Sequence, residues 1–369
     1  MSLLATRIQD WRVHAVEFDN NMSRPCEYGA LDFFVSQTDS GRSFATPELR
    51  ERAIQSIGTN VQIPVIDYNG GVTISNVRSC VVPDNHNTSN LYQLVFATYS
   101  TGFSMIPALH HNNDISYNHD LFKKMMNITR ALGNALDQGA VAALIAQQTQ
   151  VFADKLGYNT IGNKINVPFD TRTEIVGDIA PIMRANCYPG ALHIIGNAGI
   201  DSMMLKFAQL GANNAINKVL EFDGKTFHYT NNVVNETDIF GSGIAVEDGN
   251  VAYFTRSGRE YLAGTSANFH EFRRELMPIL GLPVDVLYKT EIKDQSAVAG
   301  ESSADMNCVL TEYFGFAIDI AFVVKYNSDS KGIANPIIHF DIDSPLGNRA
   351  AIPVVITNGQ SNPVITQDA

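Results

Sequence analysis

The stretch DISYNHDLFKKMMNITRALGNALDQGAVAALIAQQTQVFADK (114–155) decides the fold, because it carries the clearest helical periodicity in the chain. Its apolar side chains recur every three or four residues, at Leu121, Met125, Ile128, Leu132 and Leu136, which is the spacing of one helix face. About 35 helical residues would extend about 50 Å. That length exceeds most helices of globular domains, so we predict a structural spine.

Two glycines and one aspartate are expected to affect the shape and the start of this helix. Gly133 and Gly139 each cost about 1 kcal/mol relative to alanine, so we expect them to mark a bend. Asp114 is expected to cap the helix at its N-terminal end.

Upstream of the spine, residues 60–108 consist of strands and turns. NVQIPVIDY (60–68) alternates, Asn69-Gly70-Gly71 predicts a turn, and VTISNVRSCVV (72–82) is expected to return. LYQLVFATYSTGFSMI (91–106) reads either as a second strand pair or as one long strand. Long ribbons are poor domains by themselves, so we expect this one to lie on a neighbouring subunit, with proteolysis of the unassembled chain starting within 69–90.

The N-terminal residues 1–45 mix aromatic and polar side chains. They predict an extended arm or else an ordinary strand pair folded onto the chain's own core. The expected aromatic anchors are Trp11, Phe18, Tyr28, Phe33, Phe34 and Phe44. A short helix follows, with Thr46 as N-cap and Pro47 in the first turn, and it is expected to stop at Gly58.

Downstream of the spine, residues 160–285 alternate between helix and strand, which predicts a compact α/β region. Helices are expected at 173–186, 200–211 and 267–276, and strands at 191–197, 225–234 and 250–256. Further strands are expected at 284–294, 308–327, 336–343 and 351–357.

The composition restricts the class of function. The chain has 369 residues, of which 45% are apolar and 17% charged, and a formal net charge of −12. A strongly acidic chain is ill suited to coating nucleic acid tightly, although a loose container for nucleic acid stays open. Four cysteines far apart in sequence predict reduced thiols rather than a zinc site. The N-terminus does not read as a signal peptide, and the apolar run 314–324 is too short to span a bilayer, so we expect a soluble protein made in a cytoplasm.

Three polar groups are candidates for chemistry. His110 and His111, with Asp114 and His119, predict either a surface metal site or a polar linker before the helix. His339, Asp341 and Asp343 alternate along one strand, as a metal or acid–base site would, or as exposed edge residues do. An arginine cluster could face nucleic acid, an acidic patch on a neighbour, or solvent from a helix face; its members are Arg256, Arg259, Arg273 and Arg274.

None of these groups combines a nucleophile, a base and an orienting residue, and no phosphate-binding or protease motif is present. The sequence therefore predicts no enzyme, and no catalytic, cofactor-binding or metal-binding residue.

The order of parts resembles the major capsid proteins of tailed double-stranded-DNA bacteriophages, the Hong Kong ninety-seven type of shell fold. The resemblance is carried by TPELRERAIQSIGTNVQIPVID (46–67), GFSMIP (102–107), RALGNALDQGAVAALIAQQTQ (130–150), GALHIIGNAGIDSMM (190–204) and TEYFGFAIDIAFVVKYNSD (311–329). It implies an α+β fold with 1–58 as N-terminal arm and short helix, 59–110 as E-loop ribbon, and 111–175 as P domain with the spine helix. It further implies 176–284 as A domain, 285–342 as returning P-domain strands and 343–369 as a tail.

The resemblance implies a structural subunit that assembles into hexamers and pentamers of an icosahedral phage head in the host cytoplasm. The implied partners are other copies of the chain, a separate scaffolding protein, a portal, decoration proteins and packaged double-stranded DNA, and no membrane. Some members cross-link an E-loop lysine to a neighbour's asparagine; the first lysine here is Lys123, so no such bond is expected. Another virion protein or an encapsulin-type shell stays open, as does a cytosolic enzyme or ligand-binding module with a pocket near His193, His228 or Asp248.

Overall fold

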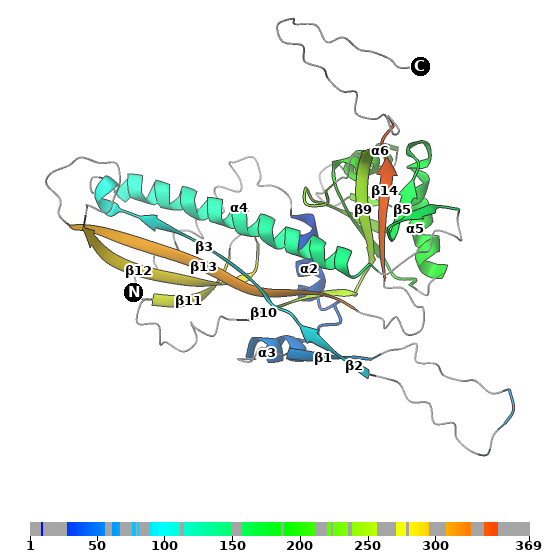
Figure 1. The fold of residues 1–369 in the computed structure, drawn as a ribbon, viewed down its shortest axis with the longest axis horizontal. Helices are drawn as coiled ribbons and strands as arrows, with labels where there is room; N and C mark the ends of the chain where they lie inside the picture. The colour runs from blue at the N-terminus through cyan, green and yellow to red at the C-terminus, as the bar shows by residue number, and fades with distance from the viewer. Residues whose placement is uncertain are drawn as a thin grey trace, which may run out of the picture.

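The computed structural model describes residues 9, 28–55, 61–66, 76–78, 80, 89–110, 114–148, 157–185, 188–210, 220–222, 224–234, 238–256, 271–277, 280–294, 308–325 and 336–345. The described residues contain both helices and strands, and these strands form three sheets, which confirms the predicted α+β class. Two sheets build the body, and the long helix α4 (Asp114–Ala146) runs along one of them (Figure 1).

A five-stranded antiparallel sheet follows the long axis of the molecule. Its path is β10–β13–β12–β11, and β3 also pairs with β13. The bounds are β3 Ala97–Met105, β10 Val251–Arg256, β11 Glu271–Leu276, β12 Pro283–Asp294 and β13 Cys308–Val324. The predicted long strands at 284–294 and 308–327 are thereby confirmed as β12 and β13.

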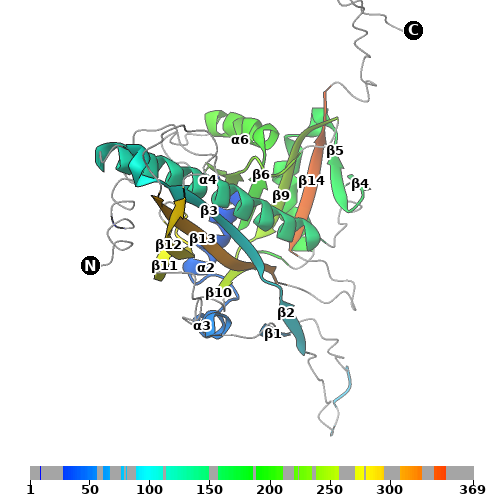
Figure 2. The ribbon, with the colours of Figure 1, turned by 60° about the vertical axis from the view of Figure 1, so that its left-hand side comes forward.

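The spine helix α4 covers one face of this sheet (Figure 2). Leu121, Met125, Leu132 and Leu136 are buried in one cluster with the β13 side chain Phe316 and its neighbours, so the predicted apolar stripe is confirmed. The helix ends at Ala146, short of the expected end, and residues 149–156 lie outside the described part of the chain.

The two spine glycines serve close packing. A Cβ on Gly133 would lie 2.6 Å from the ring of Tyr28, and one on Gly139 would lie 2.3 Å from the Tyr99 hydroxyl. Tyr28 in turn donates a hydrogen bond to the Arg130 carbonyl of the spine at 3.1 Å. The structure therefore gives these glycines a role that differs from the expected bend.

The N-terminal region departs from the expected extended arm, because Gly29–Asp39 forms the helix α2. Phe33 and Phe34 are fully buried on it, so the prediction of aromatic anchors is confirmed while the extended conformation is wrong for these residues. α2 lies against α4, β10 and β8, and burial on several sides stabilises a helix whose aromatic-rich sequence lacks a clean amphipathic period.

The short helix α3 (Pro47–Gln55) begins as predicted. The Leu49 amide donates to the Thr46 hydroxyl at 3.4 Å, and the Arg50 amide donates to the Thr46 carbonyl at 3.1 Å. Thr46 is therefore the N-cap. The expected end at Gly58 lies outside the described residues.

A seven-stranded mixed sheet forms the second part of the body, in the order β4–β5–β14–β9–β6–β8–β7. Its strands are β4 Asn159–Ile161, β5 Lys164–Val167, β6 Leu192–Gly196, β7 Leu220–Phe222, β8 Lys225–Tyr229, β9 Ile239–Glu247 and β14 Ile337–Asp343. The helices α5 (Glu174–Ala185) and α6 (Ala198–Leu210) share its apolar core, which confirms the predicted α/β region.

The chain crosses between the two sheets more often than the expected domain ranges allow. β14 falls in the range 285–342, yet it pairs with β9 and β5 of the seven-stranded sheet. β10 falls in the range 176–284, yet it pairs with β13 of the five-stranded sheet. Strand partners are set by tertiary packing, which position along the chain does not reveal.

The helix expected at 267–276 is wrong over its described residues, because Glu271–Leu276 is the strand β11. It pairs with β12 from Glu271 opposite Tyr288 to Leu276 opposite Pro283. Phe272 and Leu276 are four residues apart, a spacing that fits one face of a helix and also one face of a strand, so the apolar pattern alone cannot separate the two.

None of the helices in the described part of the chain is both long enough and apolar enough to cross a lipid bilayer.

Candidate assembly interface

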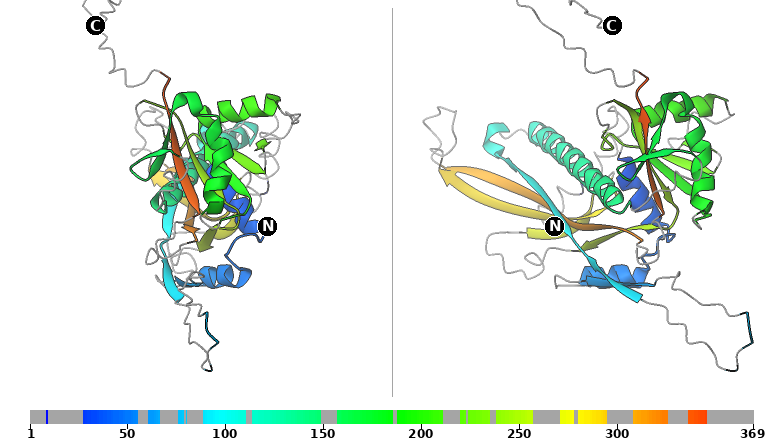
Figure 3. Two further views of the ribbon diagram at one scale, coloured as in Figure 1. Left: turned by 90° about the vertical axis from the view of Figure 1, so that its right-hand side faces the viewer. Right: turned by 45° about the vertical axis from the view of Figure 1, so that its right-hand side comes forward.

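The ribbon formed by β1 (Val61–Ile66) and β2 (Ser89–Leu94) is a sheet of its own. The two strands pair antiparallel from Val61 opposite Leu94 to Ile66 opposite Ser89, and among the described strands neither pairs with a third. The described residues 76–78 are exposed and lie away from both large sheets (Figures 1 and 3). This part of the chain therefore projects from the body.

The pairing of the ribbon differs from the sequence-based expectation. We expected 72–82 to return along the first strand after a turn at Asn69-Gly70-Gly71, whereas β1 pairs with β2 at 89–94. The expected turn lies outside the described residues. The connection between the paired strands is therefore residues 67–88, which is longer than the expected turn at Asn69-Gly70-Gly71.

The root of the ribbon is fixed in the body beside α3. Leu94 is 1% exposed and belongs to an apolar cluster with Ala53, Phe254 and Val323, against which Val61 packs. This burial anchors one end of a hairpin that would be marginal alone.

The segment 91–106 is neither one strand nor a hairpin pair. It forms the end of β2 and then β3, which pairs with β13 from Ala97 opposite Ile320 to Met105 opposite Glu312. The expected E-loop range 59–110 therefore includes residues that belong to the five-stranded sheet. At the joint, the Arg256 guanidinium lies 4.6 Å from the Phe96 ring centroid.

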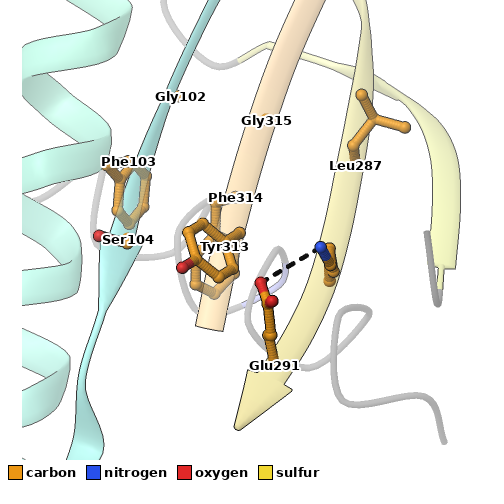
Figure 4. A pocket seen from close by; sticks show the side chains of 9 residues that line it. Gly102, Phe103, Ser104, Leu287, Glu291, Tyr313, Phe314 and Gly315 are labelled. Atoms are coloured by element: carbon orange, nitrogen blue, oxygen red, sulfur yellow. Dashed lines mark ion pairs between the residues drawn. The ribbon is translucent and has the colours of Figure 1, made fainter. Parts of the chain in front are cut away.

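A groove of about 540 Å³ opens on the five-stranded sheet, over β3, β13 and β12 (Figure 4). Gly102 and Gly315 are opposite each other in its floor, and a Cβ on Gly102 would lie only 2.7 Å from the Phe314 carbonyl oxygen. The charges at its rim neutralise each other, because Lys289 Nζ lies 3.3 Å from the Glu291 carboxylate. The groove is thus a hollow in the sheet surface with a mixed apolar and polar lining.

The histidines near the start of the spine do not form a metal site in the described residues. His110 ends a short 3-10 helix, Pro107–His110, with Nδ1 3.2 Å from the Ser116 hydroxyl and Nε2 3.7 Å from the Asp120 carboxylate. Its ring stands edge-on to Tyr117. These contacts fit the polar linker before a helix; His111 lies outside the described part.

The group His339, Asp341 and Asp343 is not on an exposed edge, because β14 lies between β5 and β9. His339 is 4% and Asp341 is 7% exposed. Burial acts to raise the pKa of the Asp341 carboxyl, but hydrogen bonds from His339 and Ser242, with the Lys164 ammonium 3.0 Å away, hold that pKa at about 2.

Ser242, His339 and Asp341 match a nucleophile–base–acid set only in residue type. The His339 Nε2 atom lies 2.9 Å from the Ser242 hydroxyl and 3.5 Å from the Asp341 carboxylate, so one ring nitrogen faces both. The other nitrogen lies 2.8 Å from the Gln148 side-chain oxygen. A triad needs the acid on the nitrogen opposite the nucleophile, and Ser242 is only 2% exposed. The group ties the end of the spine to the seven-stranded sheet.

The arginine cluster is spread over strands, so the expected solvated helix face is wrong. Arg256 binds Asp319 at 3.2 Å, Arg274 donates to the Thr255 hydroxyl at 3.2 Å, and Arg273 lies 4.0 Å from Glu275. Arg259 lies outside the described residues. The three described guanidinium groups thus have partners within the chain.

His193, His228 and Asp248 come together, as the alternative of a ligand site requires, but α2 fills the space beside them. The Phe33 ring centroid lies 4.8 Å from that of His193 and 5.4 Å from that of His228. The rings are joined by a contact of 3.1 Å between His193 Nδ1 and His228 Nε2. The two histidines therefore form a packing surface for α2.

Asp137 is the buried polar residue that sequence reasoning missed. It lies on the spine, is 0% exposed, and accepts hydrogen bonds from the Leu31 amide at 2.9 Å, the Asn232 side chain at 2.7 Å and the Thr230 hydroxyl. The Leu31 amide belongs to the first turn of α2, so Asp137 caps that helix from outside. The available signal was a carboxylate directly beside the apolar stripe, next to Leu136.

No protein-family model matches the sequence, and no curated protein matches it. Solved structures of phage proteins are similar. A chain of Mycobacterium phage Bobi is 13% identical with a TM-score of 0.47, covering 89% of this chain and 94% of that one. A chain of Microbacterium phage Oxtober96 is 11% identical with a TM-score of 0.47, covering 87% and 93%. A chain from the capsid of a native GTA particle is 10% identical with a TM-score of 0.45, covering 81% and 91%.

Likenesses with TM-scores below 0.5 do not establish what this chain does, so its function has to be inferred from its own geometry. That geometry brings together one projecting ribbon, one long sheet–helix body and one compact α/β part. The described residues of the predicted candidate sites make contacts within or between these parts.

Proposed function

We propose that this chain is a structural subunit of an icosahedral phage head. Copies of it assemble into hexamers and pentamers, and the closed shell encloses double-stranded DNA. Assembly takes place in the host cytoplasm, and the product is located in the virion. The chain acts by forming contacts rather than by catalysis.

The observation that carries this proposal is the β1–β2 ribbon. A two-stranded hairpin is marginal in water unless its surface is covered, and beyond its root this one finds no third strand among the described residues. The described residue Val77 is 76% exposed. A neighbouring copy that receives the ribbon would bury this surface, and repetition of one such head-to-tail contact gives a ring when the rotation between copies closes.

The body supports the same function. A 33-residue spine helix and the 17-residue strand β13 give a stiff plate that keeps its shape while its edges make contacts. We propose the same division of the chain: a ribbon, a plate with the spine helix, and an α/β part that lies near the centre of each ring.

The other partners are proposed on charge and sequence. A net charge of −12 suits DNA that is confined by the shell rather than bound tightly to it. A separate scaffolding protein, a portal and decoration proteins complete the proposed particle. Because residues 1–122 contain no lysine, packing rather than an isopeptide bond from the ribbon has to hold the shell.

A shortened ribbon tests the proposal without disturbing the body. Ile66 and Ser89 are paired, so replacement of residues 67–88 by Asn-Gly closes β1 and β2 with a two-residue hairpin turn. We expect the wild-type chain, expressed with the genes beside its own, to sediment as large particles. The shortened chain should sediment as single subunits or small oligomers with an unchanged thermal midpoint.

Particles formed equally well by the shortened chain would contradict the role given to the ribbon. A wild-type chain that never leaves the monomer or dimer would contradict the shell itself. The control is Val95→Ala, a change just outside the ribbon at a side chain that is 78% exposed. This variant should form particles as the wild-type chain does.

A further inference from the structure

Helix α2 is held at three points along its length. At its start, Asp137 accepts the Leu31 amide, and Gly29 packs so closely on β8 that a Cβ would lie 2.2 Å from the Tyr229 carbonyl oxygen. At its end, Asp39 accepts hydrogen bonds from Arg50 at 2.9 Å and from the Tyr253 hydroxyl at 3.1 Å. Between these points it rests on the two histidines.

The middle contact depends on the protonation of those rings. Gln37 Nε2 lies 3.4 Å from His193 Nε2, and His193 Nδ1 lies 3.1 Å from His228 Nε2. Each contact has one donor and one acceptor if the Gln37 amide donates to His193 and His193 Nδ1–H donates to His228. That arrangement requires both rings to be neutral.

Protonation therefore removes acceptors from this chain of contacts. A proton on His228 Nε2 faces the N–H of His193, and a proton on His193 Nε2 faces the amide of Gln37. Two imidazolium rings 3.1 Å apart would also repel each other next to the apolar ring of Phe33. We propose that the His193–His228 pair is an acid-sensitive latch, which holds α2 on the seven-stranded sheet at neutral pH and releases it on acidification.

Two charged groups near the pair act in opposite directions on the protonation of His193. Asp248 Oδ1 lies 3.5 Å from His193 Nε2 and favours protonation, whereas Arg42, 3.8 Å from the Asp248 carboxylate, opposes it. The other ion pair at the end of the helix, Asp39 with Arg50, binds Tyr253 rather than the rings.

Burial lowers the pKa of His228, to about 3, with a further lowering by His193. Burial also lowers the pKa of His193, against the opposing effect of Asp248. Because these pKa values lie below the ordinary value of 6.5, the latch is at full strength above pH 6.5 and weakens as the pH falls toward 3.

Amide hydrogen exchange of the full chain tests the latch. Exchange is measured on peptides from Gly29–Asp39 and, for comparison, from β13, between pH 7.5 and pH 4.5, and is corrected for the intrinsic pH dependence of exchange. We expect opening of α2 to increase by up to about 100-fold for each ring that stays neutral in the folded chain, the limit set by the interval between the ordinary pKa value of 6.5 and pH 4.5. Protection of β13 should hold over the same range.

Replacing both rings with glutamine, His193→Gln with His228→Gln, should abolish this pH dependence, whereas His110→Gln should leave it intact. The Asp248→Asn variant keeps both rings and removes the charge that favours protonation of His193. It should therefore lower the pKa of His193 further while α2 is in place, and so increase the opening of α2 at pH 4.5 relative to the wild-type chain.

Loss of protection in β13 at the same midpoint as α2 would overturn the proposal, because it would signify global unfolding. An unchanged pH dependence in the double glutamine variant, or no increase in the acid-induced opening with Asp248→Asn, would overturn it as well. None of these outcomes depends on whether the chain assembles into shells.

Discussion

At the scale of single residues, Asp137 is the side chain on which the spine, α2 and the segment after β8 converge. A buried carboxylate that accepts several hydrogen bonds stabilises only while those donors keep it, since an unmatched group retains the full cost of desolvation. Asp137 thus fixes the start of α2 to the spine by polar contacts inside an apolar core.

Asp137→Asn tests this role, because the amide nitrogen of the asparagine would face groups that donate hydrogen bonds to Asp137 in the wild-type chain. We expect the free energy of unfolding to fall by about 2–4 kcal/mol, as measured by urea denaturation. Asp120→Asn on the same helix is the matched control: Asp120 is 37% exposed and pairs with Lys124, so its effect should stay within about 0.5 kcal/mol. Equal effects of the two changes would contradict the account.

The glycines of the helices allow a second comparison. Gly133→Ala would press a Cβ onto the buried Tyr28 ring and should destabilise the chain by about 1–3 kcal/mol. Gly177→Ala on α5, where nothing lies within 4 Å of the added atom, should stabilise it by about 0.5–1 kcal/mol. Thermal denaturation of both variants measures the signs, and a stabilising Gly133→Ala would show that Tyr28 yields readily.

At the scale of elements, the sequence predicts what is local. The spine was predictable because 33 residues repeat one apolar period, and β12 and β13 were predictable from long apolar and β-branched runs. α2 and β11 were not, since their short patterns fit two conformations and burial decided between them. The sheet to which β14 belongs was beyond sequence reasoning as well, because pairing partners lie far away in the chain.

The root of the ribbon gives an element-scale prediction from two neighbouring residues. Leu94 is 1% and Val95 is 78% exposed. Leu94→Ala should lower the free energy of unfolding by about 2–4 kcal/mol, because it opens a cavity between α3, β10 and β13. Val95→Ala should change it by less than about 0.5 kcal/mol. Chemical denaturation monitored by circular dichroism distinguishes them, and a small loss for Leu94→Ala would mean that the ribbon root is not anchored.

The candidate sites show the same limit at this scale. The sequence suggested a ligand pocket near His193, His228 or Asp248 and a polar site at 339–343, whereas tertiary packing shows that these groups hold elements together. The Ser242 hydroxyl contacts the His339 ring although the two residues are 97 positions apart in the chain, and no local sequence pattern predicts such a contact.

At the scale of the whole molecule, the chain combines a rigid body with a hairpin that pairs with no third strand among the described residues. The body needs no partner for its apolar clusters, which draw on α2, α4 and both large sheets. Under the proposed function the ribbon does need a partner, so we expect the body to fold before ordered assembly begins.

Negative-stain electron microscopy of the high-mass fraction tests this central claim most directly. The chain would be expressed alone and together with its neighbouring genes, and the fraction that sediments fastest would be imaged. The account predicts closed shells of uniform size, tens of nanometres across. A monodisperse monomer or dimer under every condition, or open tubes and rings without closed shells, would contradict it.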